Sequence, residues 1–311
     1  MSYADKVFKE NLKSILKEGT STKNQKIRPH WEDGTPAYTI KQFGISNVYD
    51  LRKEFPAITV RKTALKSCMD EILWIYQKKS NNINDLNSHI WNEWADKDGS
   101  IGKAYGYQVG KTFKIGSDSI NNIEPLKIYP SFRIVSNPTD KDSLNVDLYL
   151  DQMDSVLYEL TNTPFSRRIM ISLWNPEELN EMRLQPCCWS VIFNVTDEGQ
   201  DKYVLNMVLN QRSNDFITAN NWNTAQYAIL LMMVAQSVNM IPGKLVHNIT
   251  DCHVYDRHID IAKELINRPE HPAPKVSLNP EIHNFYDFKT SDLIVEDYET
   301  EPQIKNIPIA I

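Results

Sequence analysis

Arg183-Leu-Gln-Pro-Cys-Cys-Trp-Ser190 brings together a thiol, a rigid residue and the start of a strand. A proline fixes its own backbone angle and has no N–H to donate, so Pro186 can hold the turn that presents Cys187. Residues 189–195 follow, and their alternating apolar side chains predict a strand. The thiol is therefore expected at the mouth of a strand.

A second apolar run, residues 203–209, predicts the next strand, and Gln211-Arg-Ser-Asn-Asp215 follows it. If the two strands are neighbours, the Cys187 thiol and the Arg212 guanidinium can lie close together. A thiolate beside a fixed cation is a nucleophile beside an anion-binding site. The alternative interpretation is that Cys187 is a small buried apolar side chain, as free cysteines often are.

The composition is typical of a globular protein that binds neither membrane nor nucleic acid. The net charge of -6 over 311 residues provides no overall basic field, so an anionic ligand must be held by local arginines. No apolar run approaches the roughly 20 residues of a membrane span, and the N-terminus has no apolar signal segment. A cytoplasmic location is therefore expected. The spacing of the four cysteines matches no metal-binding pattern, and no metal is expected.

The periodicity of apolar residues predicts a mixture of helices and strands. Helices are predicted at residues 3–18, 65–76, 146–160, 222–240 and 259–266, and further strands at 37–44, 57–60, 169–174 and 245–255. The segment at about 111–145 is polar and is predicted to be a surface excursion with weak strand content. Because no repeat or linker is visible, residues 1–311 are treated as one domain.

Several polar side chains occupy positions where a purely structural role is not the only explanation. Glu71 lies between Met69 and Ile72 on a predicted helix, where a carboxylate is costly unless it is hydrogen-bonded or has a function. Trp91 and Trp94 are three residues apart and share a helix face, which fits either a core pair or a site for a flat ring.

Other polar positions group by face or by segment. Asp251, His253 and Tyr255 alternate along a predicted strand, so their side chains share one face. The adjacent arginines Arg167 and Arg168 point in opposite directions if their segment is extended. The apolar C-terminal tail is expected to be frayed unless it folds over a site.

Together, and in this order along the chain, these segments resemble the folate-dependent thymidylate synthase family. The matching segments are Asp70-Glu-Ile-Leu-Trp74, His89-Ile-Trp-Asn-Glu-Trp94, Ala104-Tyr-Gly106, Ser166-Arg-Arg168, Pro186-Cys187, Gln211-Arg-Ser-Asn-Asp215, Trp222-Asn223, Asp251-Cys-His-Val-Tyr255 and the terminal Ile-Ala-Ile311. The resemblance runs from Glu71 to the last residue and is looser over the first sixty.

The resemblance implies an α+β fold in which helices pack on a large mixed sheet, and a homodimer formed through that sheet. It implies a methyltransferase that converts dUMP to dTMP, with 5,10-methylenetetrahydrofolate as carbon donor and hydride source. Cys187 would be the thiolate that adds to uracil C6, which makes C5 nucleophilic, and Arg212 would lower the thiol pKa. Glu71 would order water for proton transfer, and Tyr105 would lie near the C5 proton.

The resemblance also implies which residues bind the two substrates. The dUMP phosphate would be held by Arg212 and Ser213 of one subunit, by Arg167 and Arg168 of the partner, and by Arg28 on a mobile loop. For the rest of dUMP, Asn223 would pair with uracil N3 and O4, Asp215 would meet O2 and the pterin, and His253 and Tyr255 would hold the deoxyribose hydroxyl. The folate ring would be lined by Ile90, Trp91, Trp94 and Leu184, with the tail at Ala310 closing over it.

The sequence departs from the family pattern in two places. Cys188 stands where the family often has a histidine after the nucleophile. Residues 218–223, Thr-Ala-Asn-Asn-Trp-Asn, replace a family segment that usually reads Leu-Gly-X-Pro-Phe-Asn. Asn223 is retained and Ala219 replaces the glycine, so the departure concerns the folate side of the site rather than the nucleotide side.

Two other functions remain open on these residues. A dUMP hydroxymethylase on the same scaffold would use the same thiol and folate but let water replace hydride. A binding protein that has lost catalysis is the alternative from another class, and the net charge of -6 and the presence of Cys187 argue against it.

Overall fold

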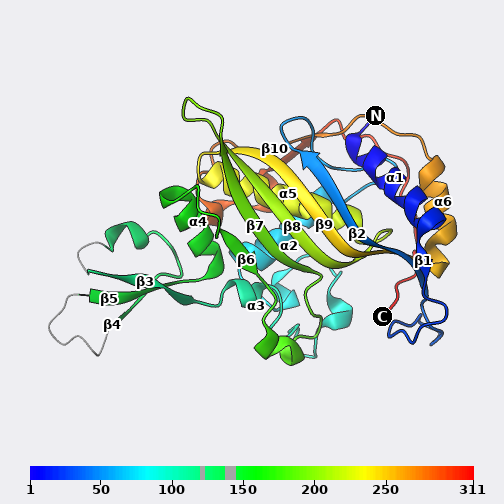
Figure 1. Ribbon diagram of the computed structural model, residues 1–311, viewed down its shortest axis with the longest axis horizontal. Helices are drawn as coiled ribbons and strands as arrows, with labels where there is room; N and C mark the ends of the chain where they lie inside the picture. The colour runs from blue at the N-terminus through cyan, green and yellow to red at the C-terminus, as the bar shows by residue number, and fades with distance from the viewer. Residues whose placement is uncertain (120–122, 137–144) are drawn as a thin grey trace.

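A six-stranded mixed sheet forms the centre of the protein in the computed structural model, which describes residues 1–119, 123–136 and 145–311 (Figure 1). The strand order is β1-β2-β9-β8-β7-β6. The bounds are β1 Thr20–Ser21, β2 Thr39–Asp50, β6 Met170–Ser172, β7 Cys188–Asp197, β8 Tyr203–Asp215 and β9 Ile241–Tyr255. Only β8 and β9 pair in parallel; the other neighbours in this sheet are antiparallel.

The strands predicted at 37–44, 169–174, 189–195, 203–209 and 245–255 are all present, several with different ends. The strand predicted at 57–60 is wrong, because the backbone N–H groups of Thr59 and Val60 do not join a sheet. They donate to Oδ1 of the buried Asp5, at 2.7 and 3.2 Å. Hydrogen bonds to the Asp5 carboxylate thus replace the strand pairing that the local sequence at 57–60 favours.

Helices cover one face of the large sheet and one end of it. Their bounds are α1 Tyr3–Glu18, α2 Leu65–Ile72, α3 Gly106–Val109, α4 Gln152–Asn162, α5 Asn220–Ser237 and α6 Ile259–Asn267. The helix α2 continues as a π-helix, Leu73–Gln77. Helices α2 and α5 lie behind the sheet in Figure 1, and α5 is buried on nearly every side, as its uninterrupted apolar sequence predicts. In the described residues, none of the helices has both the length and the apolarity to cross a membrane.

The helix predicted at 146–160 is partly wrong. Its first residues form β5, Asn145–Leu150, and α4 starts only after Asp151, whose carboxylate accepts the Asp154 backbone N–H at 2.9 Å. Val146, Leu148 and Leu150 are buried in alternation, so their period is two. The same apolar residues had been assigned to the helical period that follows.

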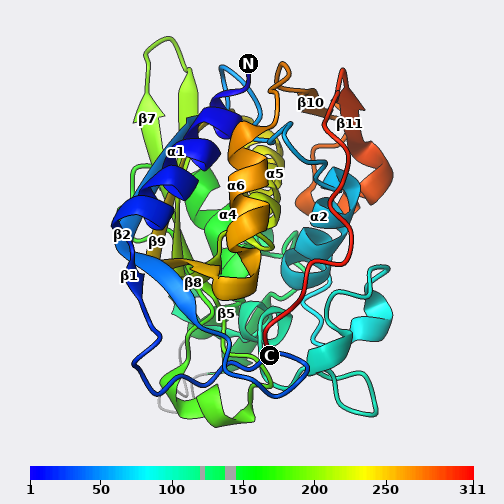
Figure 2. The same ribbon diagram turned by 90° about the vertical axis from the view of Figure 1, so that its right-hand side faces the viewer.

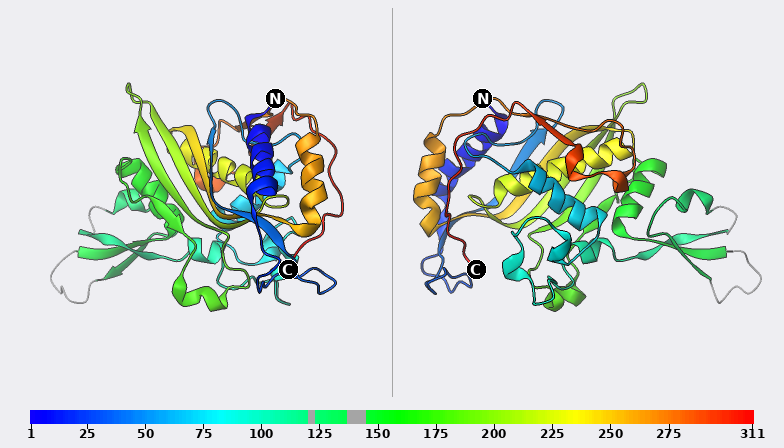
Figure 3. Two further views of the ribbon diagram at one scale, coloured as in Figure 1. Left: turned by 45° about the vertical axis from the view of Figure 1, so that its right-hand side comes forward. Right: turned by 180° about the vertical axis from the view of Figure 1, so that it is seen from behind.

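A small second sheet projects to one side of the molecule (Figures 1 and 3). Its order is β3-β5-β4, with β3 at Phe113–Ser119 and β4 at Arg133–Ser136. It corresponds to the excursion predicted at about 111–145, of which residues 120–122 and 137–144 lie outside the described part of the chain. A further antiparallel pair, β10 Lys275–Leu278 and β11 Leu293–Glu296, precedes the C-terminal tail.

The C-terminal tail is docked rather than frayed. Figure 2 shows it running past α2 toward the N-terminal loop. There Ile311 exchanges two backbone hydrogen bonds with His30, both of 2.9 Å. The tail is therefore fixed to the loop of residues 22–36.

A buried ion cluster links the projecting sheet to the body. The Lys79 ammonium contacts the carboxylates of Asp151 and Asp154. It also donates a hydrogen bond of 2.8 Å to the Tyr286 hydroxyl. The side chains of Asp151 and Asp154 are 2% and 0% exposed. Removing one partner from such a cluster leaves buried charge without compensation.

We predict that Lys79→Met lowers the free energy of unfolding by about 3 kcal/mol, because the two buried carboxylates lose their cation. Urea unfolding followed by circular dichroism, at one protein concentration, measures this. The matched control is Lys114→Met, which breaks the exposed Lys114–Asp147 pair of 2.8 Å and should change little. Equal losses in both variants would contradict the prediction.

Candidate active site

The thiol of Cys187 lies at the start of β7, directly beside β8. The Cys187 carbonyl accepts the Arg212 backbone N–H at 2.8 Å, so the two predicted strands are neighbours. An Arg212 Nη2 atom lies 3.7 Å from the Cys187 Sγ. Of the four cysteines, Cys187 alone is half-buried, whereas the other three are buried. The thiol and guanidinium are thus brought together as the sequence predicts.

The net effect on the thiol pKa differs from the expectation that Arg212 would lower it. Burial raises the pKa of Cys187 above its ordinary value, and the charges of Arg212 and Arg28 lower it by less. Part of the guanidinium is engaged elsewhere, since it donates to the Gln185 carbonyl at 3.1 Å. The arginines therefore reduce the cost of the thiolate without making it the dominant form.

The loop of residues 22–36 places Arg28 on the same side as the thiol. Arg28 is exposed, yet its charge also acts to lower the pKa of Tyr255, which burial raises to about 12. The tail and this loop are joined at His30, as described above. Arg28 and Arg212 thus approach the thiol from different parts of the chain.

Tyr105 contacts the backbone of Cys187 through its hydroxyl group. Its hydroxyl oxygen accepts the Cys187 backbone N–H at 3.2 Å. Its backbone has a φ of 47°, which non-glycine residues rarely adopt and which costs about 1–3 kcal/mol. Such strain persists only where the surroundings hold it, and here it aims the hydroxyl at Cys187. Burial, followed by the nearby thiols, raises the pKa of Tyr105 well above its ordinary value, so the hydroxyl stays protonated.

Glu71 is buried on α2 and is not a helix-surface carboxylate. Its Oε1 accepts the indole N–H of Trp91 at 2.9 Å, and its Oε2 accepts that of Trp222 at 2.7 Å. Burial raises the pKa of Glu71 to about 7, while hydrogen bonds from Trp222, Trp91 and Gln226 lower it. The carboxylate is therefore satisfied and able to change its protonation near neutral pH.

The tryptophans expected to line a flat ring lie beside Tyr105. The Trp91 ring is 4.8 Å from that of Tyr105 and 5.8 Å from that of Trp94, edge to face in both cases. Trp91 is buried and Trp94 is half-buried on a 3₁₀ turn, Asn92–Trp94. Ile90 is exposed and Leu184 is half-buried.

A chain of amides fixes the orientation of Asn223 in the first turn of α5. The Gln211 Nε2 donates to the Asn223 Oδ1 at 2.9 Å, and the Asn223 Nδ2 donates to the Gln226 Oε1 at 3.0 Å. Gln226 in turn hydrogen-bonds to Glu71. One defined donor and one defined acceptor are therefore available at Asn223.

Asp215 closes the other side of the site, at the end of β8. Its Oδ1 accepts the Ile217 N–H at 3.0 Å and lies 3.6 Å from the His258 Nδ1. Although burial acts to raise it, the pKa of Asp215 is lowered by His258 and Thr218. His258 also donates from Nε2 to the Pro308 carbonyl at 2.7 Å, so it connects Asp215 to the tail.

The polar row predicted on β9 exists. The His253 Nδ1 is 2.8 Å from the Asp251 Oδ1, and Asp251 also pairs with Lys41 at 2.7 Å. The His253 and Tyr255 rings are 5.0 Å apart. Ser213 pairs with Asp251 in the β8–β9 register, and Asp215 pairs with His253. The ends of both strands thus present their polar groups together.

Arg167 and Arg168 do not join these residues within one chain. Both are exposed, before the edge strand β6. The Ile169 carbonyl accepts the Phe193 N–H at 2.9 Å, so Arg168 lies near residue 194 of β7. Six residues separate that position from Cys188, which is ~20 Å along an extended strand. These arginines cannot reach the thiol of their own chain.

Three residues of the site were missed from the sequence: Trp222, Gln226 and His258. Trp222 was quoted with Asn223 and as part of the altered segment 218–223, but no role was predicted for it, and Gln226 was hidden in the apolar run of α5. His258 follows the polar row by three positions, which is a weak signal. Among the described residues, no group of three His, Cys, Asp or Glu side chains could hold a metal ion.

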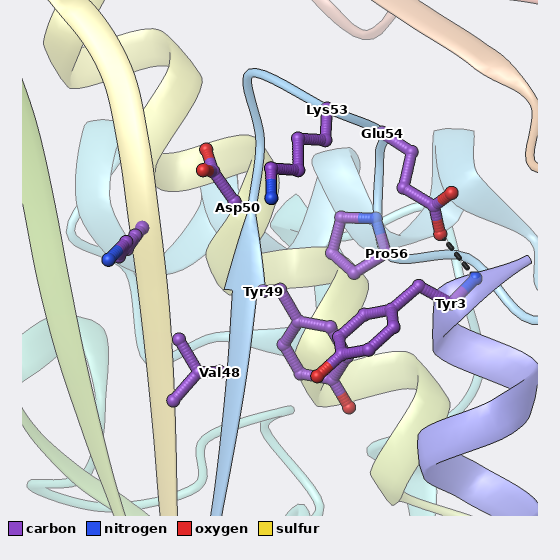
Figure 4. A pocket seen from close by; sticks show the side chains of 8 residues that line it. Tyr3, Val48, Tyr49, Asp50, Lys53, Glu54 and Pro56 are labelled. Carbon is purple, nitrogen blue, oxygen red and sulfur yellow. Dashed lines mark hydrogen bonds between the residues drawn. The ribbon is translucent and has the colours of Figure 1, made fainter.

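Of two cavities considered, one borders the site and the other is remote from it. One of about 330 Å³ is lined by Arg61, Lys62, Thr63, Ala64, Thr218, Trp222, Gln303 and Ile307, between α2, α5 and the tail. Another of about 370 Å³ lies by Tyr3, Tyr49 and Lys244 (Figure 4). Asp50 pairs with Lys244, at the opposite end of β2 and β9 from Asp251, so this second cavity is remote from Cys187.

Comparisons with known proteins agree on one family. The family model described as thymidylate synthase matches residues 6–310. Thymidylate synthase 1 of Bacillus subtilis is 37% identical over 303 residues, covering 96% of each chain, and the thymidylate synthase of Bacillus phage phi3T is 36% identical with the same coverage. The solved thermostable thymidylate synthase A from Bacillus subtilis superposes with a TM-score of 0.82 at 35% identity, over 100% of both chains.

The geometry at the thiol predicts its reactivity. We expect iodoacetamide to label Cys187 before the three buried cysteines, with a pH midpoint above that of an ordinary thiol because burial raises its pKa. Since Arg212 lowers that pKa, Arg212→Met should move the midpoint further up. Mass spectrometry of labelled peptides across pH measures both effects.

The matched control is Arg52→Met, since Arg52 pairs with Asp50 and Glu198 at the far end of the sheet. It should leave the midpoint in place. An unchanged midpoint in Arg212→Met, or earlier labelling of Cys252, would contradict the expectation.

Proposed function

The chain belongs to the thymidylate synthase family, and we propose that Cys187 is the nucleophile of that family's reaction. As a member it is a methyltransferase that forms dTMP from dUMP, and the family uses 5,10-methylenetetrahydrofolate as its co-substrate. The named relatives are thymidylate synthases, so the hydroxymethylase alternative is not favoured. The fold expected from the resemblance, helices packed on a large mixed sheet, is confirmed.

The contact between Cys187 and Arg212 is the observation that carries the proposal. The Sγ forms a bond to uracil C6, and the displaced electron pair moves onto C5 and O4. C5 then attacks the methylene carbon of the folate. This attack breaks one of the two C–N bonds that hold the methylene in the folate. Loss of the C5 proton then expels tetrahydrofolate by breaking the second C–N bond and leaves an exocyclic methylene on C5. Hydride from the tetrahydrofolate adds to this methylene carbon while the thiolate leaves C6, so that dTMP and dihydrofolate result.

Glu71 and Tyr105 are proposed to move protons during this sequence. A carboxylate with a pKa of about 7 has both forms available at neutral pH, which suits a group that orders water near uracil O4 and the folate nitrogens. The Tyr105 hydroxyl lies against the Cys187 backbone and stays protonated, which supports a role in meeting the C5 proton through its oxygen.

Asn223 is proposed to select uracil. Its Oδ1 accepts from Gln211 and its Nδ2 donates to Gln226, so the amide cannot turn over without breaking both hydrogen bonds. An oxygen that accepts and an N–H that donates match the N3–H and O4 of uracil. Asp215 is proposed to meet uracil O2 by its backbone and the pterin by its carboxylate, and His253 with Tyr255 to hold the deoxyribose hydroxyl.

The folate side is proposed to consist of Ile90, Trp91, Trp94 and Leu184, with Ala310 on the tail above them. The docking of the tail at His30 supports this, because a closed tail excludes water while hydride is transferred. The contact from His258 to Pro308 ties the tail to Asp215.

The phosphate site is proposed to be shared between two subunits. Arg212 and Ser213 belong to the subunit that supplies Cys187, and Arg28 approaches on its loop. The ~20 Å that separates Arg168 from its own Cys187 supports a role for Arg167 and Arg168 across an interface. A homodimer would then be required for activity.

The face of the sheet that α2 and α5 leave uncovered is the proposed interface (Figure 1). A ladder of side chains crosses four of its strands: the Ser46 hydroxyl donates to Asn248 at 2.8 Å, Asn248 to Asn210 at 3.3 Å, and Asn210 to the Ser190 hydroxyl at 3.0 Å. Because these polar groups satisfy one another, the face can be buried without leaving them unpaired.

Two further expectations stay as proposals. Residues 1–311 are proposed to form one domain, which the hydrogen bonds between Ile311 and His30 support because they tie the C-terminal tail to the N-terminal part of the chain. A cytoplasmic, reducing location is proposed because four free cysteines, one of them the nucleophile, need protection from oxidation.

The experiment that tests the function incubates the protein with dUMP and methylenetetrahydrofolate. Dihydrofolate absorbance should rise while dTMP forms; hydroxymethyl-dUMP without dihydrofolate would instead favour the alternative. Cys187→Ala should abolish turnover and retain dUMP binding in calorimetry, since the arginines hold the phosphate. Cys252→Ala, which alters a buried thiol on β9, should stay active. Loss of dUMP binding in Cys187→Ala would contradict this division of roles.

Mixed dimers test the shared phosphate site. Cys187→Ala and the double variant Arg167→Glu/Arg168→Glu should each be inactive alone. After subunit exchange, about a quarter of full activity should return, because half of randomly formed dimers are hybrids with one complete site. A mixture of Cys187→Ala and Arg212→Ala is the control and should stay inactive, since both residues come from one subunit. Absence of recovery in the first mixture would rule out the shared site.

A further inference from the structure

Trp222 stands where the family pattern has phenylalanine, and it contacts a proposed proton-transfer group. The family segment usually ends Pro-Phe-Asn, whereas this chain reads Asn221-Trp-Asn223. The Trp222 indole N–H donates to the Glu71 Oε2 at 2.7 Å. A phenylalanine ring has no hydrogen-bond donor and could not make this contact. The bond therefore depends on the indole at this position.

The two oxygens of Glu71 are held from two directions. Trp91, before the 3₁₀ turn Asn92–Trp94, donates to Oε1 at 2.9 Å, and Trp222, in the first turn of α5, donates to Oε2. Two rigid indoles on different elements fix the plane of a carboxylate better than one, because rotation about its last bond would break both hydrogen bonds. A buried carboxylate also needs such donors to offset its desolvation.

We propose that Trp222 is a positioning residue that orients Glu71 and sets its affinity for a proton. This inference rests on the role proposed above for Glu71. Trp222 and Asn223 are adjacent, so the first turn of α5 would hold the proton-transfer group and read the base as one unit. The Trp222 ring also lines the cavity of about 330 Å³ with Thr218 and Ile307, which places it between Glu71 and the tail.

The charged and titratable groups around Glu71 act in known directions. Asp70, on the same helix, acts to raise the Glu71 pKa and is itself held by two hydrogen bonds from Asn87. Cys68 on α2, Tyr105 before α3, and Cys188 on β7 interact electrostatically with Glu71, and burial raises the pKa of each. These three groups stay neutral near pH 7, so the indole donors and Gln226 are what oppose the effect of burial.

The sign of the pH effect follows from these contacts. The Trp222 hydrogen bond favours the ionised carboxylate and lowers the pKa of Glu71. Without it the pKa rises from about 7, and a smaller fraction of Glu71 is ionised at a given pH. If the ionised form orders the water, the acidic limb of kcat moves to higher pH.

Replacing the indole N–H alone is the sharpest test. Trp222→Phe keeps an aromatic ring, and a tryptophan analogue with sulfur in place of the N–H keeps the bicyclic shape. Both should move the acidic limb of kcat upward by about one pH unit, which is the effect of a tenfold change in proton affinity, with the KM for dUMP unchanged. Trp91→Phe removes the other donor and should move the limb in the same direction.

Trp31→Phe is the matched control, because the Trp31 indole N–H donates to Asp256 at 3.1 Å and has no bond to Glu71. It should leave the limb where it is. A limb that stays in place in both Trp222 variants, or that moves equally in Trp31→Phe, overturns the positioning role.

Glu71→Gln separates this inference from the proposed function. If Glu71→Gln keeps full kcat and the acidic limb, the role proposed for Glu71 fails. If Glu71→Gln loses activity while the Trp222 variants titrate like the unmodified enzyme, only the positioning role fails. If the role of Glu71 and the positioning role of Trp222 are both correct, adding Trp222→Phe to Glu71→Gln should cause no further loss of kcat, since the two residues act through one carboxylate.

Discussion

The parallel pairing of β8 with β9 is the constraint on which the site depends. Parallel neighbours need a long crossover, and α5 provides it by returning the chain from Asp215 to the start of β9 at Ile241. The C-terminal ends of both strands and the N-terminal turn of α5 are therefore forced to one end of the sheet. Asp215 pairs with His253 in that register, and Asn223 lies on the turn above them. Ligand sites commonly form outside the carboxyl ends of such strands.

Burial at this end of the sheet acts on two titratable groups with different consequences. It raises the pKa of Glu71 to about 7, where proton exchange is easy at neutral pH. It also raises the pKa of Cys187, which works against the thiolate, and only the charges of Arg212 and Arg28 oppose it. The same desolvation thus suits the proton-transfer role proposed for Glu71 and makes the proposed nucleophile, Cys187, dependent on its arginines.

The spacing of apolar residues correctly predicted those helices and strands whose tertiary contacts favour the same structure. The strands around Cys187 and Arg212 and the buried helix α5 follow from apolar patterns that no tertiary contact overrides. The strand predicted at 57–60 failed because Asp5, more than fifty residues away, takes its backbone N–H groups. The start of α4 was placed too early because Leu148 and Leu150 fit both a strand and a helix period.

The site was predictable where residue types reveal chemistry, and hidden where distant residues meet. The contact of Cys187 with Arg212 follows from two strand ends, whereas Trp222 and Glu71 are 151 positions apart, and no spacing rule connects them. The distance between Arg168 and Cys187 could be found only from the pairing of β6 with β7, which no local pattern predicts.

Alternation along β8 explains how one strand can serve both the proposed base site and the proposed interface. Successive side chains of a strand point to opposite faces. Gln211 is buried beneath α5 and donates to Asn223, which orients the group proposed to read the base. Arg212 points to the uncovered face, where its guanidinium lies 5.9 Å from the Trp174 ring. The proposed phosphate end of the site therefore opens toward the face proposed to receive a second subunit, while the proposed base end stays enclosed. A partner's arginines can then add to Arg212 without crossing the core.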